Sequence, residues 1–518
     1  MFARVHSAVL SGIEARVLEV EVDVGGGLPS FAIVGLPDAS VREARERVRS
    51  ALKNSGFPFP IGSITVNLAP AEWRKVGAAL DLPVAAALLA IGGLKTRQAR
   101  RRVFLGELGL SGEVRPVRGT LSLALAAREG GFEEVVLPAA NAPEAACVDG
   151  LSIVPVRTVS EMAAFLSGAA CPRSPALALP PPDPAARDRV DFSDVRGQAV
   201  ARRALEISAA GGHHVLLVGP PGAGKTMLAR RLPTILPPLS RSESIEVTRI
   251  HSAAGTLPPG SGLVRTPPFR APHHGVSAAG LVGGGVRPSP GEISLAHRGV
   301  LFLDELPEFR RDVLEAIRQP LEERRVTVVR VGGACTFPCD LLLVAAMNPC
   351  PCGHSGDPDR VCTCDEGSRR RYTRKVSGPL LDRIDLHVSV PAVPWRELAR
   401  PAQGETSAAI RERVLRARGL AAARAPGIPA FRNADIPAGQ LERIAALDAP
   451  ARRLAEGAVL RLGLSVRGFH RALRVARTIA DLECGDRVTA AHLAEAISYR
   501  QRTVPDLVGR IDRVAAPP

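Results

Sequence analysis

The sequence is poor in lysine, aromatic residues and cysteine, and it has no long apolar run. Only five of its 518 residues are lysine, so arginine carries most of the positive charge, and aromatic residues make up 3% of the chain. Nine cysteines in a chain of this length are too few for a scaffold held together by disulfides. Because no stretch of about 20 apolar residues occurs, we expect no membrane span.

The amino-terminal stretch also lacks the pattern of a signal peptide, since no uninterrupted apolar core precedes a small-residue cleavage site. We therefore expect a cytoplasmic protein. A length of 518 residues suggests about three domains, and a hydrophobic content of 46% is ample for buried cores.

Positive charge is what the chain has in excess, with a formal net charge of +15. Residues 401–518 contain 19 arginines, no lysine and 12 acidic residues, so this part carries nearly half of the excess. The balance is compatible with a phosphate-rich partner such as DNA, although a solvated basic face is the commoner explanation.

The segment from His213 to Thr226, HHVLLVGPPGAGKT, has the pattern of a nucleotide-binding loop. A buried strand leads into a complete G-x-x-x-x-G-K-[ST] motif, and a helix follows. Lys225 would reach the β- and γ-phosphates, and the Thr226 hydroxyl would bind Mg²⁺. A Gly-rich turn that binds nothing is the alternative, but this context favours ATP. The residues expected around the phosphates are Gly219, Pro220, Pro221, Gly222, Ala223, Gly224, Lys225 and Thr226.

Two later buried strands end in polar residues that would complete such a site. The first, Val300–Glu305 (VLFLDE), ends in Asp304, expected to bind Mg²⁺, and in Glu305, expected to deprotonate the attacking water. The second, Leu341–Met347, is followed by Asn348, a natural sensor of the γ-phosphate. A strand that ends in Asp-Glu is weak evidence alone, but its place about 80 residues after the loop strengthens it.

Four of the cysteines form two C-x-C pairs: Cys350, Cys352, Cys362 and Cys364. Two such pairs, nine residues apart, can supply four thiolates to a tetrahedral Zn²⁺. The spacing is tighter than the usual C-x-x-C, and free thiols are the alternative. His354 is a spare candidate ligand, whereas Cys335 and Cys339 are expected to pack in the interior.

A β-hairpin is predicted over Arg324–Phe337 (RRVTVVRVGGACTF), with its turn at Gly332-Gly333 or nearby. An ordinary basic hairpin is the alternative to a role in DNA binding. The candidate DNA contacts on this hairpin are Arg324, Arg325 and Arg330.

A helix is predicted from about Ser465 to Leu482, with Arg467, Arg471 and Arg474 on one face. One interpretation of these arginines is a solvated basic face. In the functional interpretation, Arg467 touches the nucleotide as a lid residue, while Arg471 and Arg474 face neighbouring subunits or DNA.

The first part of the chain contains GELGLSGEVRPVRGTLSLALAAREGGFEEVVLPAAN, from Gly106 to Asn141. This run resembles the protease domain of Lon, a fold shared with ribosomal protein S5. Lon-type peptidases need a Ser nucleophile and a Lys base. Leu121 stands where the lysine is expected, and the stretch 77–83 (GAALDLP) stands where the serine is expected. The resemblance therefore implies an inactive domain that serves as a platform for assembly or partners.

From Asp191 to about Arg502 the chain resembles the magnesium-chelatase-like branch of the AAA+ ATPases. The motifs GPPGAGKT, PHH, GEISLAHRGVLFLDE, NPCPCG, SGPLLDRIDL and SVRGFHRALRVARTIADL occur in that order. Together with the Lon-like part, nearly the whole chain resembles the YifB/ComM family. The implied fold is an α/β P-loop AAA+ core with a helical C-terminal lid, preceded by a Lon/S5-like α+β domain.

The expected domain order follows from this resemblance and from composition. Residues 169–190 are rich in Pro and Ala without a period, which is typical of a linker. The predicted units are the Lon-like domain at 1–168, the linker at 169–190, the AAA+ domain at 191–399, the helical lid at 400–505 and a tail at 506–518.

The resemblance also implies roles for further residues. Gly197 and Gln198 stand where AAA+ proteins contact the adenine. Arg383 corresponds to the arginine finger that meets a neighbouring subunit's nucleotide. Arg467 corresponds to the second sensor, although Arg471 lies nearby.

The implied activity is that of a hexameric ring ATPase. The ComM members act as DNA helicases that promote branch migration when incoming DNA is integrated during natural transformation. The main alternative is a chelatase-type motor subunit that remodels a protein partner for metal insertion, although such subunits usually lack the Lon-like half. An ATP-dependent protease is disfavoured by the missing Ser-Lys pair.

Overall fold

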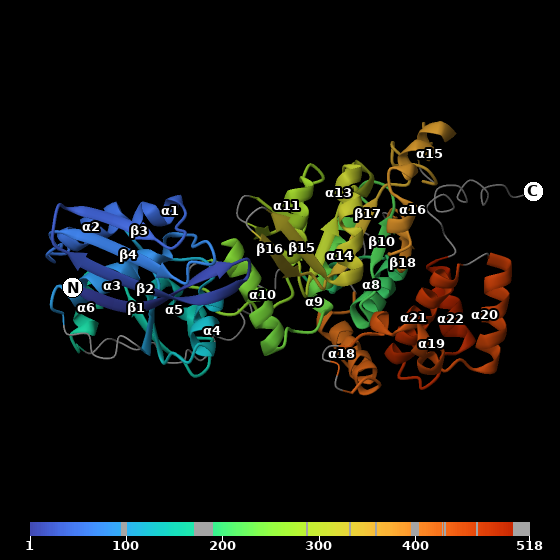
Figure 1. Ribbon diagram of the computed structural model, residues 1–518. Helices are drawn as coiled ribbons and strands as arrows, with labels where there is room; N and C mark the ends of the chain where they lie inside the picture. The colour runs from blue at the N-terminus through green and yellow to red at the C-terminus, as the bar shows by residue number, and fades with distance from the viewer. Residues whose placement is uncertain are drawn as a thin grey trace, which may run out of the picture.

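The computed structural model describes residues 1–94, 101–169, 190–258, 260–285, 288–330, 333–357, 360–394, 404–426, 428, 431–462 and 465–500. In this part of the chain, two units built around β-sheets are followed by a group of helices (Figure 1). Nearly all of the predicted linker and the whole predicted tail lie outside the described residues.

The first unit is built on a seven-stranded sheet with the order β3-β4-β2-β1-β5-β8-β9. The β1–β2 and β2–β4 pairs are antiparallel, whereas β3–β4 and the pairs from β1 to β9 are parallel. The strands are β1 (Phe2–Ser11), β2 (Glu14–Gly25), β3 (Ser30–Val34), β4 (Ser63–Ala69), β5 (Arg102–Phe104), β8 (Glu134–Pro138) and β9 (Ser152–Val156).

Helices cover both faces of this sheet, because alternate residues of its strands point to opposite sides. On one face, Val20 and Val22 join an apolar cluster with α2 (Ala44–Asn54), α3 (Asp81–Ile91) and α6 (Val159–Leu166). On the other face, a second cluster includes α4 (Thr120–Glu129) and α5 (Ala142–Ala145). This is the expected mixture of helices and strands around one sheet.

The second unit, which we call the motor, has a five-stranded sheet with the order β11-β14-β17-β10-β18. All neighbouring strands in it are parallel, and the three central strands are buried along their whole length. The strands are β11 (Phe269–Arg270), β14 (Val300–Leu303), β17 (Leu342–Met347), β10 (Val215–Val218) and β18 (Leu386–Ser389). This sheet confirms the expected P-loop α/β core.

Three elements of the motor matter for the site. Helix α8 (Ala199–Gly211) precedes β10, and α9 (Lys225–Ile235) follows it. The predicted hairpin forms from β15 (Arg325–Arg330) and β16 (Gly333–Pro338). Its inner face, including Val326 and Phe337, packs into the motor core.

The final part is helical, as expected for a lid. It consists of α18 (Ser407–Ala423), α19 (Ala438–Ala445), α20 (Ala449–Leu462), α21 (Val466–Leu482) and α22 (Ala490–Ser498). The apolar faces of these helices and of α8 form one continuous cluster with the motor sheet. In the part of the chain that the structure describes, no helix is both long and apolar enough to cross a membrane.

The first unit docks on the motor through α10 (Arg241–Ala254), which packs against α4. Arg249 donates from Nε to the Ser122 hydroxyl at 3.2 Å and from Nη2 to the carbonyl of Ile13 at 3.3 Å. The Ile13 side chain joins the motor core, and Ser252 donates a hydrogen bond to the buried Glu144. The two units are therefore joined by both polar and apolar contacts.

Candidate active site

The loop between β10 and α9 has a backbone that requires glycine. Gly222 and Gly224 have φ angles of 78° and 88°, in the left-handed region that favours glycine. A Cβ atom on Gly219 would collide with the carbonyl oxygen of Val390, just beyond β18. The loop is thus a turn of backbone that leads directly into the positive end of α9.

Lys225, the first residue of α9, is buried with its ammonium group inside this loop. Its Nζ donates to the carbonyls of Gly219 at 2.7 Å and Pro220 at 2.9 Å, and to Oδ1 of Asn348 at 3.1 Å. Burial lowers the pKa of Lys225, and the nearby charges of Asp304 and Glu305 oppose that shift. The ammonium is therefore held beside the sensor residue that the sequence predicted.

The predicted acidic residues lie at the end of β14. Thr226 donates from its hydroxyl to Oδ2 of Asp304 at 2.7 Å, and the Glu305 backbone N–H donates to Oδ1 of Asp304 at 2.9 Å. Because β14, β17 and β10 are adjacent and parallel, their carboxyl ends bring these groups to one edge of the sheet. The Thr226 hydroxyl and the Asp304 carboxylate offer the oxygen ligands that Mg²⁺ prefers.

His274 is a neighbour of Glu305 to which the sequence analysis assigned no role. Its Nδ1 lies 3.3 Å from Oε2 of Glu305, and its ring lies against His273 with centroids 4.0 Å apart. The PHH motif was the feature of the sequence that could have predicted this contact. It lies just beyond β11, and because β11 pairs with β14, the chain beyond β11 passes close to Glu305. The imidazole is placed to hold the carboxylate that is expected to activate water.

Gly197 and Gln198 connect the start of α8 to the same loop. Gln198 donates from Nε2 to the carbonyl of Pro391 at 2.6 Å and to that of Ala223 at 3.3 Å. Both residues adopt left-handed backbone conformations, with φ of 60° at Gly197 and 55° at Gln198. Their contact with adenine stays a prediction.

Arg383, the expected arginine finger, is held within its own chain. Its Nη2 lies 2.6 Å from Oε1 of Glu322, and its Nη1 donates to the carbonyl of Pro379 at 2.7 Å. The side chain is 15% exposed. The contact of Arg383 with the nucleotide of a neighbouring subunit stays a prediction.

The arginines of α21 do not share one environment. Arg467 is exposed near the start of the helix. Arg471 donates to Oδ1 of Asp385 at 2.8 Å and to the carbonyl of Arg383 at 3.0 Å, and Arg474 donates to the carbonyl of Ile436 at 2.9 Å. Arg471 and Arg474 are therefore hydrogen-bonded within the chain to carbonyl and carboxylate groups of the motor and lid, and their contact with neighbouring subunits or DNA stays a prediction.

The candidate DNA contacts also differ from one another. Arg324 is paired with Asp435 and lies 3.7 Å from Asp340, so it is tied to the lid. Arg325 is 65% exposed and lies 3.5 Å from Glu323. The Arg330 backbone pairs with Gly333, but its side chain and Gly332 lie outside the described part of the structure.

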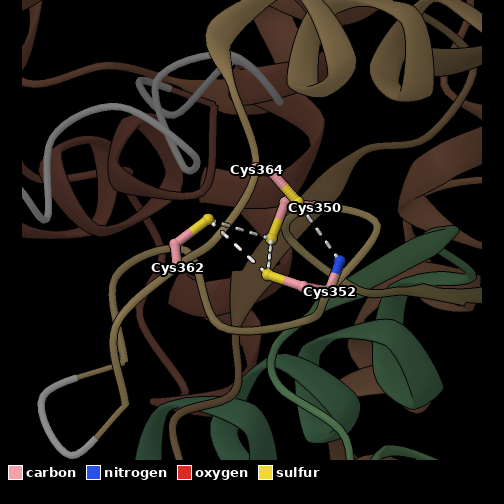
Figure 2. Close-up of side chains that lie close together, drawn as sticks. All are labelled: Cys350, Cys352, Cys362 and Cys364. Carbon is pink, nitrogen blue, oxygen red and sulfur yellow. Dashed lines mark hydrogen bonds between the residues drawn. The ribbon is translucent and has the colours of Figure 1, made fainter.

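The four cysteines of the two C-x-C pairs come together beside the nucleotide-binding loop (Figure 2). Their sulfur atoms all lie within 4.8 Å of one another. His354 does not belong to this group, because its Nδ1 contacts Oδ2 of Asp357 at 3.2 Å. Cys335 and Cys339 pack in the motor core, as expected.

Comparisons with known proteins match this architecture. Residues 191–398 match the family described as magnesium chelatase, subunit ChlI, and residues 404–500 match its C-terminal domain. Residues 20–141 match the family described as subunit ChlI of Mg-chelatase.

Two relatives are similar over nearly their entire length. The uncharacterized protein YifB of Escherichia coli is 42% identical over 500 residues, which cover 96% of each chain. The competence protein ComM of Haemophilus influenzae is 42% identical over 505 residues, which cover 96% of this chain and 97% of ComM. Lon protease 2 of Bacillus subtilis is 31% identical over 146 residues, or 26% of each chain.

The assembled P-loop, the parallel sheet and these similarities agree with one another. The chain therefore belongs to the YifB/ComM family of magnesium-chelatase-like AAA+ ATPases.

Proposed function

We propose that this protein is a ring motor that hydrolyses ATP to move DNA, acting as a helicase that promotes branch migration of incoming DNA during natural transformation. The observation that carries the proposal is the full-length similarity to a competence protein in a chain whose P-loop, acidic pair and sensor converge. The net charge of +15 suits a polyanionic partner.

The residues of the site divide the work of hydrolysis among them. Thr226 and Asp304 would hold Mg²⁺, which neutralises charge on the β- and γ-phosphates. Glu305 takes a proton from the attacking water, and Lys225 stabilises the phosphate charge. Asn348, bonded to Lys225, orients the water or the γ-phosphate.

The proposal includes a homo-hexamer in the cytoplasm. Arg383 would supply positive charge to the nucleotide of a neighbouring subunit, so that each site is completed by the next copy of the chain. Arg467 would act from the lid on the nucleotide of its own or an adjacent subunit. The exposed Arg467 and the partly exposed Arg383 lie outside the cluster around Lys225, which is consistent with sites completed by assembly.

DNA contact is assigned to the hairpin, with Arg325 as its exposed cation and Arg330 farther along the same strand. Arg324 would contribute only after release from Asp435. The cysteine group is proposed to hold Zn²⁺.

The decisive experiment supplies ATP and a labelled four-way DNA junction to the full-length protein. We expect strand exchange that requires ATP, and binding that weakens steeply as salt rises, because phosphate contacts release counterions. Arg325→Ala should reduce exchange, whereas Arg310→Ala, at an arginine that is 71% exposed elsewhere on the motor, should not. Binding that is absent or insensitive to salt would reject the DNA assignment.

A chelatase-type motor that remodels a protein partner is the second candidate, favoured by the family description of residues 191–398. It predicts ATP hydrolysis that responds to a metal-inserting partner protein and not to DNA junctions. Measuring hydrolysis with each partner separates the two functions.

A further inference from the structure

The four-cysteine group lies in a loop that begins directly after the sensor Asn348 and ends at α15 (Glu366–Arg374). Cys350 lies 3.3 Å from Cys352 and 3.7 Å from Cys362, and Cys352 lies 3.6 Å from Cys362, measured between sulfur atoms. A tetrahedral zinc site with Zn–S bonds of about 2.3 Å has sulfur atoms about 3.8 Å apart. The observed separations approach that edge length.

The sulfur atoms also have the surroundings of metal-bound thiolates. The backbone N–H of Ser355 donates to Sγ of Cys350 at 3.3 Å, and that of Cys352 donates to Sγ of Cys364 at 3.4 Å. Such N–H donors orient metal ligands and stabilise their charge. All four sulfurs fit within 4.8 Å, which suits one ion and leaves no room for the bridging sulfides of an iron–sulfur cluster.

The same loop touches the nucleotide-binding loop at two points. Gly353 has a φ of 85°, and a Cβ atom there would collide with the ring of Pro221. Asn348, two residues before Cys350, accepts the hydrogen bond from Lys225. The first C-x-C pair is therefore flanked by a sensor contact and a P-loop contact.

Helix α15 follows the second C-x-C pair and packs into the motor core. The helix begins at Glu366 with Asp365 as its N-cap, so it follows Cys364 immediately. Its buried Tyr372 belongs to the same apolar cluster as Met347, the residue before Asn348. The helix after the second C-x-C pair thus packs into the same core as the strand that ends just before Asn348.

We propose that a single Zn²⁺ bound by Cys350, Cys352, Cys362 and Cys364 is a structural clasp that positions Asn348 and the outer wall of the P-loop. The loop from 348 to 365 contains no helix or strand in its described residues. Without the ion, four thiols at these distances would have little to hold the two pairs together, and Asn348 would lose its anchor. The coupling to catalysis rests on the proposed hydrolysis of ATP, whereas the metal site itself does not.

The test uses the full-length protein and the double substitution Cys362→Ser/Cys364→Ser, with Cys484→Ser as the control at an exposed cysteine. Residues 362 and 364 are chosen because neither is part of the sensor or the P-loop. Three quantities are measured: zinc per chain, ATP turnover, and hydrogen exchange of residues 348–357. The wild type and the control should each hold about one zinc.

In the double variant we expect loss of the zinc, faster exchange in residues 348–357, and a fall in kcat on the order of tenfold or more. Affinity for a non-hydrolysable ATP analogue should change little, because Lys225 and Thr226 are intact. If the variant fails to fold, chelation of the wild-type protein followed by return of Zn²⁺ should give the same loss and then recovery.

The outcomes separate the metal site from the function. A wild-type protein that holds no zinc and takes up neither Zn²⁺ nor Co²⁺ overturns the site. Loss of zinc without a change in exchange and turnover overturns the clasp. If the wild type hydrolyses no ATP but still shows zinc-dependent exchange, the clasp stands and the proposed function fails.

Discussion

The first unit and the motor are both sheets covered by helices, but they use their polar groups differently. In the motor, Lys225, Asp304 and Asn348 meet where three parallel strands end. In the first unit, the residue at the expected lysine position, Leu121, is fully buried. Its backbone N–H donates to Glu144, which also accepts a hydrogen bond from Ser252 of the motor.

This difference shows how similar scaffolds take different roles. The region of the first unit that resembles the Lon catalytic domain contributes its polar groups to the contact with α10, so they bind the motor. The motor keeps its polar groups on the loop after β10 and at the ends of strands, where a phosphate chain can displace the internal hydrogen bonds of Lys225. The comparison predicts that changes in the motor alter chemistry, whereas changes in the first unit alter stability or docking.

The largest effect is expected from Glu305→Gln, which removes the proposed general base without changing the shape of the side chain. ATP hydrolysis should fall by about 10²- to 10⁴-fold while ATP binding persists. In the first unit, Glu133→Gln changes a carboxylate that is 57% exposed and should leave hydrolysis unchanged. Turnover at the wild-type rate in Glu305→Gln would remove that residue from its role.

Buried carboxylates provide a second comparison, because each unit contains an example that is paired with arginine. Asp385 pairs with Arg471 at 2.8 Å, between the motor sheet and α21, and Asp81 pairs with Arg47 at 2.6 Å. Each Asp→Asn substitution should lower the free energy of unfolding by about 3–5 kcal/mol, since an arginine is left without its counter-charge.

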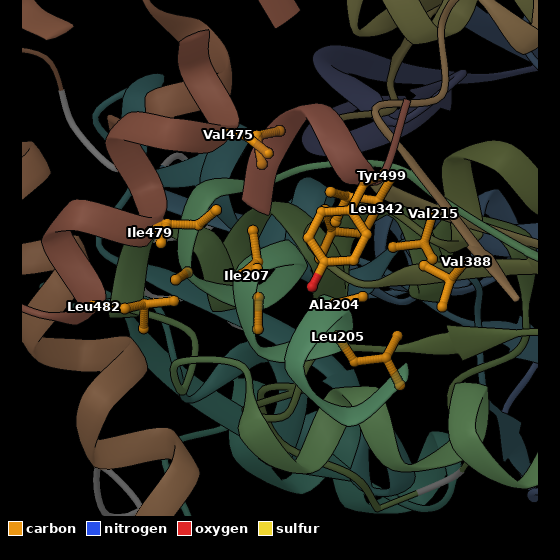
Figure 3. Packing of buried hydrophobic residues seen from close by; sticks show 14 of the residues in the cluster. Ala204, Leu205, Ile207, Val215, Leu342, Val388, Val475, Ile479, Leu482 and Tyr499 are labelled. Atoms are coloured by element: carbon orange, nitrogen blue, oxygen red, sulfur yellow. The ribbon is translucent and has the colours of Figure 1, made fainter. Parts of the chain in front are cut away.

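The two variants should differ in which part of the protein loses stability. Motor and lid share one apolar core, in which Ile479 and Leu482 of α21 and Ile207 of α8 take part (Figure 3). Hydrogen exchange should therefore report Asp385→Asn in the motor and lid together, and Asp81→Asn in the first unit. If both variants increased hydrogen exchange equally in all parts of the protein, the two regions would not be stabilised separately.

A third prediction concerns His274, which contacts Glu305 at 3.3 Å. Because a base that is no longer held in place works less well, His274→Ala should reduce kcat by roughly tenfold with little change in the KM for ATP. His273→Ala, which removes the neighbouring ring and its hydrogen bond from the Gly275 N–H, is the matched control. An unchanged kcat in His274→Ala would show that the contact has no part in catalysis.

Acid should weaken the contact between the motor and the lid. Burial alone would raise the pKa of Asp340, but the charges of Arg432 and Arg324 lower it to about 2 from an ordinary value of 3.8. A carboxyl with a depressed pKa stabilises the folded state above about pH 4, and this contribution is lost as pH falls toward about 2. Melting temperatures of the wild type and Asp340→Asn should therefore converge over that range. If the difference in melting temperature stayed constant from pH 5 to pH 2, the lowered pKa of Asp340 would not contribute to stability in this way.

The smallest effect is expected at the docking contact. Arg249→Ala removes two hydrogen bonds of 3.2 Å and 3.3 Å to the first unit and should cost about 1 kcal/mol. Hydrogen exchange should rise in α4 and α10, while basal ATP hydrolysis stays near the wild-type rate. A large loss of hydrolysis would show that docking controls the motor. The proposed separation of chemistry in the motor from docking in the first unit would then be wrong.

Much of this arrangement was predictable from the sequence. The alternation in β2, the apolar runs of β10, β14 and β17, and the Gly-rich loop each depend on neighbours along the chain. The positions of Lys225, Thr226 and Asp304 follow, because a parallel α/β sheet brings strand ends to one edge. Arg324 and Arg471 could not be placed in this way, since their partners Asp435 and Asp385 are far away in sequence.

The P-loop, the acidic pair after β14 and the two C-x-C pairs can be recognised in the sequence, because local spacing encodes each of them. Only the tertiary structure decided that His274 reaches Glu305, that Arg471 is bound by Asp385, and that the cysteines surround one point next to the P-loop. Those contacts arise from the order of strands in the sheet and from the shared core of motor and lid. The physical reason is that a side chain's partner is set by packing between elements, which spacing along the chain does not specify.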